Sequence, residues 1–211
     1  MIRTVRYLSL LIGVTFGTIL GWRLLSRRYA LPCPSWLAWL LENPYMDMVA
    51  RAERTIVNMN VQPGMKILDV GCGPGRLTIP LAVSVGDKGT VIGLDIQPAM
   101  LIQAQQRVDK AGLTNVQLVQ AEANRPMFAP NTFDRAILVT VLGEIPDRRA
   151  ALAAIFDALK PGGMLTVTEV LPDPHYQRVK TARALSAAVG FMEDSYVSSR
   201  PAYTISFIKP E

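Results

Sequence analysis

Cysteine and histidine are scarce in this chain of 211 residues. The chain has two cysteines, Cys33 and Cys72, and one histidine, His175. Two cysteines are too few for a disulfide framework or a cysteine-based metal site, so we expect no bound metal. Half of the residues are hydrophobic, which excludes an intrinsically disordered chain. The length fits one domain with an extension and allows a substantial core.

Acidic residues are absent from the first 40 positions, and this asymmetry locates the charge of the chain. Those positions hold five arginines: Arg3, Arg6, Arg23, Arg27 and Arg28. Residues 41–211 hold equal numbers of basic and acidic residues, so the net charge of +5 belongs entirely to the N-terminal segment. A nucleic-acid partner would require a basic face on the main domain. We therefore expect no nucleic acid as a partner.

Charge is also absent from residues 7–22, YLSLLIGVTFGTILGW. The run is slightly shorter than the roughly 20 residues that span a bilayer. Extension through residue 25, with arginines reaching the surface at both ends, would make up the difference. We therefore expect a hydrophobic anchor over residues 1–28, with membrane contact through residues 7–25. The three tryptophans follow closely and favour the membrane interface, which predicts an interfacial linker or amphipathic segment over residues 29–45.

Two other interpretations of this N-terminal run stay open. One is a cleaved signal peptide, although no small-x-small cleavage site follows the run cleanly. The other is a buried core helix, although 16 uncharged residues exceed the apolar stripe that a surface helix needs. Three arginines after the run, against two before it, favour a membrane-anchored protein whose main domain, residues 46–211, faces the cytoplasm.

A glycine-rich stretch at residues 66–82, KILDVGCGPGRLTIPLA, organises the main domain. It reads as a short buried strand, a turn at Gly71, Gly73 and Gly75, and the start of a helix. Glycine suits a loop that a ligand approaches closely, because it has no Cβ. Asp69 lies two residues before the first glycine, inside the apolar run.

The glycine spacing separates two classes of nucleotide site. A dinucleotide fingerprint requires G-x-G-x-x-G, whereas this loop has G-x-G-x-G. The pattern D-x-G-x-G-x-G resembles motif I of the class I S-adenosylmethionine (SAM) dependent methyltransferases. The resemblance implies that Asp69 and the loop amides hold the amino and carboxylate groups of SAM. An NAD-binding Rossmann oxidoreductase stays open as the less favoured alternative.

A second acid falls where this resemblance requires one. Residues 90–96, TVIGLDI, predict a strand that ends at Asp95, about 20 residues past the loop. A carboxylate at that offset accepts hydrogen bonds from both ribose hydroxyls. Read alone, Asp95 is equally well explained as a helix N-cap. Together with the glycine loop it favours a nucleoside site.

The resemblance extends over residues 46–211, where strands and helices alternate in the order that the family requires. Residues 159–163, Leu-Lys-Pro-Gly-Gly, precede the fifth strand and are a second hallmark of the family. The expected fold is α/β: a Rossmann-like, seven-stranded, mostly parallel sheet with an antiparallel C-terminal hairpin and helices on both faces. The third strand is expected over residues 116–123. The general likeness is to small-molecule, ubiquinone-biosynthesis-like methyltransferases.

The resemblance also implies a set of cofactor-binding residues at the carboxyl ends of the strands. Glu122 and its neighbour would hold the adenine, Met100 would pack on it or simply fill the core, and Val139 and Thr140 would border the methyl group. Cys72 is interpreted as a small filler within the loop. The full expected set is Asp69, Gly71, Cys72, Gly73, Gly75, Asp95, Ile96, Met100, Glu122, Ala123, Val139 and Thr140.

Few residues are candidates for acid–base chemistry. His175, Tyr176 and Glu144 are the candidate catalytic residues, and Glu169 at the end of the fifth strand would face the acceptor or cap a turn. The expected reaction is direct in-line methyl transfer from SAM to a small, apolar or membrane-associated acceptor, such as a lipid or a quinone precursor. A membrane-tethered module that binds SAM without turnover is the alternative from another class.

Overall fold

The computed structural model describes residues 17–18, 21, 26, 32–35, 52–171 and 173–211. The anchor expected over residues 1–28 and the interfacial segment expected over residues 29–45 therefore lie almost wholly outside the described residues. Within the part of the chain that is described, no helix is both long enough and apolar enough to cross a bilayer.

Strands and helices alternate along the described main domain. Their bounds are α3 (Ala52–Asn58), β1 (Lys66–Val70), α4 (Thr78–Val85), β2 (Thr90–Asp95), α5 (Pro98–Lys110), β3 (Val116–Gln120), β4 (Phe133–Val139), α6 (Arg148–Ala158), β5 (Leu159–Val170), α7 (Val179–Ala187), β6 (Met192–Ser199) and β7 (Ala202–Ile208).

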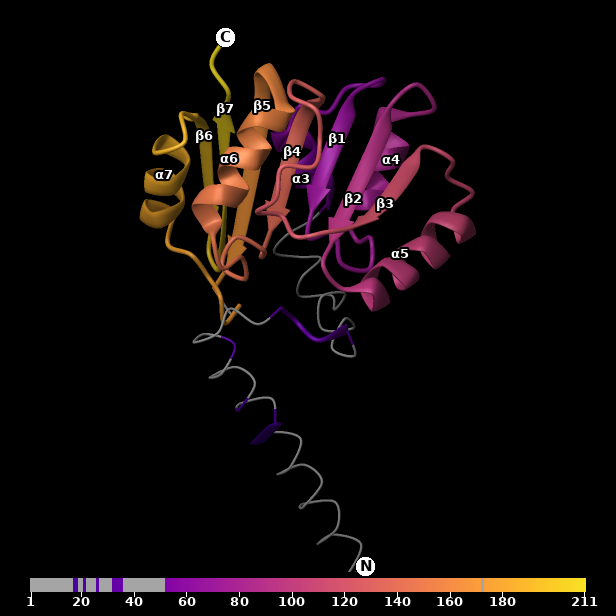
Figure 1. Ribbon diagram of the computed structural model, residues 1–211, viewed down its shortest axis with the longest axis horizontal. Coiled ribbons are helices and arrows are strands. Elements are labelled where there is room, and N and C mark those ends of the chain that lie inside the picture. The colour runs from indigo at the N-terminus through magenta and orange to yellow at the C-terminus, as the bar shows by residue number, and fades with distance from the viewer. Residues whose placement is uncertain (1–16, 19–20, 22–25, 27–31, 36–51, 172) are drawn as a thin grey trace, which may run out of the picture.

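The strands form one seven-stranded sheet in the order β3-β2-β1-β4-β5-β7-β6. Neighbours from β3 to β5 are parallel, whereas β7 is antiparallel to both β5 and β6. The strand order reverses between β1 and β4, which is where ligands bind in open α/β sheets. Figure 1 shows the carboxyl ends of the parallel strands at the lower edge of the sheet and the C-terminus at the upper edge.

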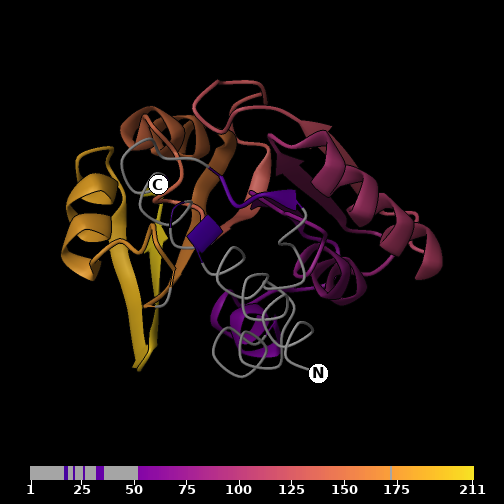
Figure 2. The ribbon, with the colours of Figure 1, turned by 90° about the horizontal axis from the view of Figure 1, so that it is seen from below.

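Helices cover both faces of the sheet, with α3 and α4 on one face and α6 and α7 on the other (Figure 2). Strand β1 supplies side chains to both layers: Leu68 and Val70 belong to the larger core cluster, and Ile67 to the cluster under α4. Burial on both faces explains why the central strands are nearly continuous apolar runs. The expected Rossmann-like sheet with its antiparallel C-terminal hairpin is thus confirmed.

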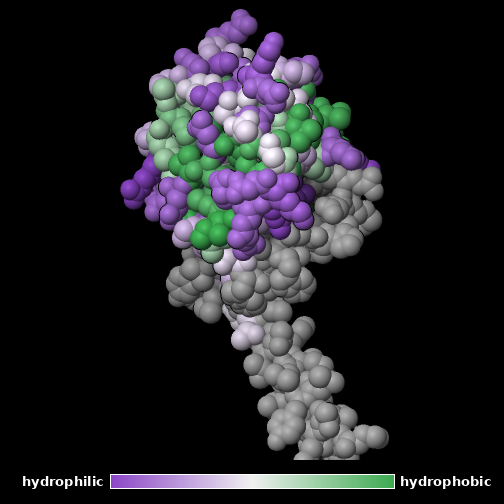
Figure 3. All heavy atoms as spheres, turned by 90° about the vertical axis from the view of Figure 1, so that its right-hand side faces the viewer, coloured by the Kyte–Doolittle hydropathy of each residue, from purple (hydrophilic) through white to green (hydrophobic). Residues whose placement is uncertain are grey.

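The outer edge of the sheet beside β2 is strand β3, whose exposed side chains are polar. Strand β3 exposes Gln117 and Gln120, and Figure 3, which views the molecule from this side, shows hydrophilic and hydrophobic side chains mixed on the surface. Polar side chains on an edge strand discourage pairing with another chain.

Two strand boundaries differ from the sequence-based expectations, and helix α6 begins after a capping residue. Strand β3 ends at Gln120, so residues 121–123 form a loop. Helix α6 begins at Arg148, because the Asp147 carboxylate accepts a hydrogen bond from the N–H of Ala150 and caps the helix. Residues 159–163, which were expected to precede the fifth strand, are part of β5, since the backbone around Gly162 exchanges hydrogen bonds with Lys209.

Hydroxyl groups line one face of the β5–β7 pair. Thr166 and Ser206 are hydrogen-bonded side chain to side chain at 3.1 Å, and Thr168 and Thr204 at 2.8 Å. Both pairs are directly opposite in the antiparallel register. Each hydroxyl thereby satisfies the other inside the protein, where an unpaired polar group would be costly.

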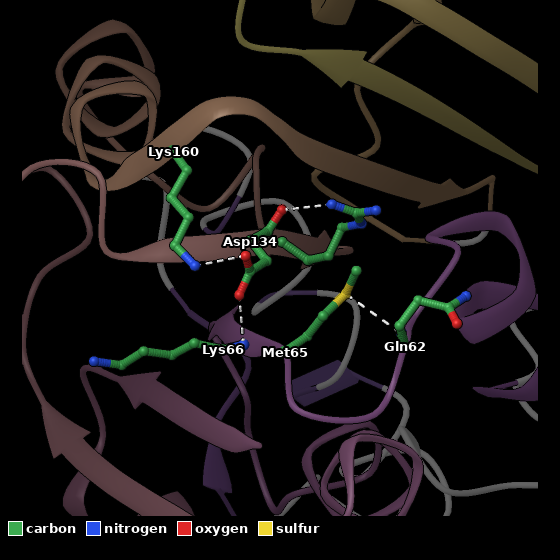
Figure 4. A network of polar contacts seen from close by, with 6 residues as sticks. Gln62, Met65, Lys66, Asp134 and Lys160 are labelled. Atoms are coloured by element: carbon green, nitrogen blue, oxygen red, sulfur yellow. Dashed lines mark hydrogen bonds and ion pairs between the residues drawn. The ribbon is translucent and has the colours of Figure 1, made fainter. Parts of the chain in front are cut away.

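A polar network at the amino end of the sheet ties three strands together (Figure 4). The Asp134 carboxylate on β4 accepts hydrogen bonds from the backbone N–H of Lys66 on β1, at 2.8 Å, and from Lys160 Nζ on β5, at 2.6 Å. Burial by itself would raise the pKa of Asp134, but these hydrogen bonds outweigh burial and hold the pKa below its ordinary value. The ionised carboxylate is therefore the form that the fold stabilises.

Replacing Asp134 by alanine should lower the free energy of unfolding by about 1 to 3 kcal/mol, because it leaves the Lys66 N–H without its acceptor. The difference from wild type should be full above the ordinary carboxyl pKa of 3.8 and should shrink as pH falls through the lowered pKa. Urea unfolding at several pH values measures it. The control is Glu193→Gln, which breaks the exposed Arg183–Glu193 ion pair and should cost clearly less than Asp134→Ala. Equal losses in the two variants would contradict the argument.

Candidate functional site

The loop after β1 requires glycine for two different reasons. Gly71, Gly73 and Gly75 have φ angles of 68°, 54° and 87°, which L side chains rarely adopt. A Cβ on Gly71 would also overlap the side chain of Val141, on the segment after β4. The N–H of Gly71 donates to the Leu94 carbonyl at 2.7 Å, which ties the loop to the end of β2. The loop is therefore held between the ends of two neighbouring strands.

A hollow lies beside Gly73. This residue is buried, yet a Cβ built on it would meet no atom within 4 Å. Space next to a buried backbone is unusual, because protein interiors are closely packed. The hollow lies over the carboxyl end of β1, beside the switch point of the sheet. Its position fits a ligand that contacts the loop directly.

Asp95, the last residue of β2, borders the same hollow. Its carboxylate accepts a hydrogen bond from the Gly73 N–H at 2.9 Å and another, on its second oxygen, from the Gln97 N–H at 2.8 Å. Burial raises the pKa of Asp95, against the lowering effect of these backbone donors. Each carboxylate oxygen has a second lone pair, so a fixed Asp95 can still accept hydrogen bonds from a diol.

Asp69 lies beneath the loop. It is 3% exposed, and its carboxylate accepts a hydrogen bond from the Thr78 hydroxyl at 2.7 Å, at the first residue of α4. Burial raises the pKa of Asp69 to about 6, opposed by the Thr78 hydrogen bond and the nearby charge of Arg76. The charge of Asp95 also raises this pKa, so the structure brings the two expected acids into one site.

The other expected cofactor residues differ in their burial. Cys72 is buried within the loop, and its sulfur lies 3.1 Å from where a Cβ on Gly93 would stand, which fits a small filler. Met100 is 2% exposed, whereas Ile96 is 48% exposed. Ala123 is partly buried and packs against the larger core cluster.

Glu122 lies in the loop after β3 and not within the strand. It follows the end of β3 by two residues and is exposed, because the strand ends at Gln120. Its carboxylate forms an ion pair at 3.2 Å with Arg125 in the same loop. The expectation that β3 extends through residue 123 is therefore wrong, whereas the role expected of Glu122 at the adenine stays a prediction.

The backbone just after β4 adopts an uncommon conformation. Val139 is its last residue, and the next, Thr140, has a φ of 56°, which is uncommon for a residue with a side chain. The Thr140 N–H donates to the Thr168 carbonyl at 2.8 Å, and its hydroxyl donates to the Val139 carbonyl at 2.7 Å. Such backbone conformations cluster at ligand sites, in agreement with the expected place of these two residues.

The candidate catalytic residues gather beyond β4 and β5. Burial raises the pKa of Glu144 well above its usual range, and the charges of Asp173, Asp95 and Glu169 raise it further. His175 is 5% exposed, and its backbone N–H donates to the Asp173 carboxylate at 2.6 Å. The Tyr176 ring packs edge-on against Tyr203 with 5.9 Å between centroids. The structure thus brings all three expected candidates to one region, next to the site of Asp95.

Two residues at the site, Cys33 and Gln97, were not predicted from the sequence. The carbonyl of Cys33 accepts a hydrogen bond at 2.8 Å from the side chain of Gln97, which follows β2. The backbone N–H of Cys33 donates at 3.3 Å to Glu144, which follows β4. The segment at residues 32–35 therefore connects the two sides of the candidate site. No local pattern announces a contact between residues 111 positions apart.

The strand order, the glycine loop after β1 and the acid at the end of β2 together define the class I SAM-dependent methyltransferase fold. Comparison with known proteins agrees. Residues 61–194 match the family described as Methyltransferase domain, which is more than half of the chain. The chain therefore belongs to that family, and the expectation of a methyltransferase domain is confirmed.

Solved structures and curated relatives give the same class. A SAM dependent methyltransferase from Aquifex aeolicus superposes with a TM-score of 0.79 at 22% identity, covering 84% of this chain and 99% of that chain. A demethylmenaquinone methyltransferase from Geobacillus sp. (strain WCH70) is 40% identical over 117 residues, which cover 56% of this chain and 50% of the relative. A ubiquinone/menaquinone biosynthesis C-methyltransferase from Teredinibacter turnerae is 43% identical over 116 residues, covering 54% and 47%. The chain thus spans about half the length of the curated relatives it matches.

Proposed function

We propose that this protein binds SAM and transfers its methyl group to a small apolar acceptor. SAM supplies the methyl group on a positively charged sulfur. The observation that carries the proposal is the hollow beside Gly73, bordered by the fixed carboxylate of Asp95. Asp95 would hold the ribose hydroxyls, and Asp69 with the loop amides would hold the amino acid end. Ile96, Met100, Ala123, Val139 and Thr140 would form the walls, and Glu122, in the loop after β3, would hold the adenine.

The charge of the site supports a cationic ligand. Four carboxyl groups interact across it, since the charges of Asp95, Glu169 and Asp173 all raise the pKa of Glu144 after burial has done so. Bringing like charges together in a buried site is unfavourable. A positive sulfonium and an ammonium group would relieve that repulsion. An NAD pyrophosphate would add negative charge to the same region, which argues against the oxidoreductase alternative.

Calorimetry tests the cofactor, with SAM and NADH titrated separately into the full chain. The proposal expects a saturable heat with SAM and none with NADH. The reverse result would replace methyl transfer by hydride transfer. Release of S-adenosylhomocysteine in the presence of a lipid extract separates an enzyme from a SAM-binding module without turnover. Mass analysis of the methylated product then identifies the acceptor.

The proposed acceptor is a quinone precursor, a lipid or a similar apolar molecule. The names of the curated relatives, which refer to menaquinone and ubiquinone, support this class. The uncharged run at residues 7–22 supports attachment to a membrane, with the main domain on the cytoplasmic side. Flotation of the full chain with phospholipid vesicles, compared with a chain lacking residues 1–28, tests the attachment. Equal flotation of both would contradict it.

SAM affinity should rise with pH between about 5 and 7, because the pKa of Asp69 is raised to about 6 by burial. Below that pKa the carboxyl is neutral and attracts the ligand ammonium less strongly, so a cation prefers the ionised site. Calorimetry across this range measures the effect, which should be several-fold. Asp69→Asn should flatten the profile. An equally steep profile in this variant would assign the pH dependence to another group.

A further inference from the structure

Glu169 lies at the carboxyl edge of the sheet, on the acceptor side of the proposed site. It is the residue before the last of β5, the strand beside β4 on the far side of the switch point from Asp95. In the parallel register its neighbour Thr168 is opposite Val139, the last residue of β4. Ligands in such sheets bind outside the carboxyl ends of the strands. Glu169 therefore lies at the edge of the sheet where such ligands bind.

One carboxylate oxygen of Glu169 accepts a hydrogen bond, and the other has no donor among the described residues. The side chain is buried, at 1% exposure, and its Oε2 accepts a hydrogen bond from the backbone N–H of Gln177 at 3.0 Å. Its Oε1 is also buried, and no donor among the residues that the structure describes lies within hydrogen-bonding distance of it. A buried polar atom without a partner is costly and needs an explanation. A ligand hydroxyl would satisfy it.

The groups around Glu169 come from four elements. Asp173 and Tyr176 lie in the loop after β5, and Tyr203 is opposite Glu169 on β7. Arg148 is the first residue of α6, and Glu144 lies in the segment before that helix. The pKa of Glu169 is raised to about 8, chiefly by burial and in part by the charge of Asp173, while the Gln177 N–H and Arg148 oppose the rise. Such a carboxyl is a stronger base than an exposed one and is closer in acidity to a phenol.

The position of this carboxyl is fixed by two packed loops. The Tyr203 hydroxyl donates to the Gln177 carbonyl at 2.8 Å, so the residue that holds Oε2 is itself held by β7. Gly143 lies so close to His175 that a Cβ on it would overlap the His175 carbonyl oxygen. Arg148 donates to the carbonyls of Leu142 and Gly143 at 3.2 Å, which keeps its charge in place. Position and proton affinity are both set before an acceptor binds.

We propose that Glu169 is a catalytic residue whose Oε1 takes the proton from a hydroxyl of the acceptor. The inference rests on the proposed methyl transfer. The O–H bond of the acceptor breaks and its proton moves to Oε1, while the electron pair released on the acceptor forms the bond to the methyl carbon. The carbon–sulfur bond of SAM breaks, its electron pair stays on sulfur, and a neutral thioether leaves. Atoms and charges balance without a further reactant.

The test uses the full chain, its Glu169→Gln variant and two probes: 2-naphthol, and 2-methoxynaphthalene, which has the same rings but no hydroxyl. In wild type saturated with S-adenosylhomocysteine, 2-naphthol should bind several-fold more tightly as pH rises from about 7 to 9 and the carboxyl ionises. Glu169→Gln should remove this rise and leave the binding of 2-methoxynaphthalene unchanged. Turnover with the acceptor found in the lipid extract should fall about 100-fold or more, at unchanged SAM affinity.

Three outcomes overturn the inference: an unchanged pH profile for 2-naphthol in Glu169→Gln, equal losses for both probes, or normal turnover. SAM calorimetry on wild type separates this failure from failure of the proposed function, because a chain that binds no SAM contradicts the function itself. If Glu169→Gln unfolds in urea more readily than wild type, Glu169→Asp replaces it. Aspartate keeps a carboxylate but withdraws it by one methylene, so the pH dependence should persist while turnover falls. If Glu169→Asp loses both the pH dependence of 2-naphthol binding and turnover, the role of Glu169 is structural.

Discussion

Replacing Asp95 by alanine should weaken SAM binding roughly 10- to 100-fold, with little binding left at low ligand concentration. The carboxylate is held by the N–H groups of Gly73 and Gln97, at 2.9 and 2.8 Å, so both of its oxygens are positioned before a ligand arrives. Loss of charge-assisted hydrogen bonds to two ribose hydroxyls corresponds to about 1 to 3 kcal/mol. Calorimetry with SAM measures the change.

The matched control for Asp95→Ala is Asp87→Ala. Asp87 is an exposed acid in the turn before β2, so its removal changes the net charge equally without touching the loop. SAM affinity in this variant should equal that of wild type. If Asp95→Ala binds SAM as tightly as Asp87→Ala does, the ribose lies elsewhere.

Replacing Gly73 by leucine should weaken SAM binding at least tenfold and up to about 100-fold, because the new side chain would occupy the hollow beside the loop. The φ of 54° adds a backbone penalty of about 1 to 2 kcal/mol, which is paid by the free protein as well. The variant should therefore fold with reduced stability and fail chiefly in binding. Thermal unfolding with and without SAM measures both effects in one experiment.

Gly64→Leu isolates the backbone penalty from the effect on the hollow. Gly64 also has a left-handed φ, of 85°, and a Cβ there would meet no atom within 4 Å, but it lies before β1 at the other end of the strand. This variant should lose similar stability and keep its full SAM-induced rise in unfolding temperature. A rise that disappears in both variants would mean that strain, and not filling of the hollow, prevents binding.

Much of the fold could be predicted because its causes are local. Apolar runs such as residues 67–70 identify strands that are buried on both faces, and their punctuation by glycine and proline sets the order of elements. The placement of Asp69 and Asp95 at one loop follows from the same rule, because adjacent parallel strands end at the same edge. The glycine spacing carried the remaining information about the ligand.

The rest depends on contacts that no local pattern encodes. The end of β3 was misplaced because β3 is an edge strand, where three residues of extra length change nothing in the core. The pairing of Cys33 with Gln97 and Glu144 joins distant parts of the chain through backbone groups, which are the same in every residue. The uncommitted oxygen of Glu169 is visible only once its burial and its neighbours are known.

The paired hydroxyls on β5 and β7 have a consequence for the acceptor pocket. Thr166 and Thr168 meet Ser206 and Thr204 on one face of the sheet, and Glu169, one residue along, points to the other. A slip of β7 by a single residue would place apolar side chains against the threonines, so these two pairs specify the alignment. The same alignment sets Tyr203 opposite Glu169. Strand β7, which is far from the glycine loop, thereby fixes the position of the Glu169 carboxylate relative to an incoming acceptor.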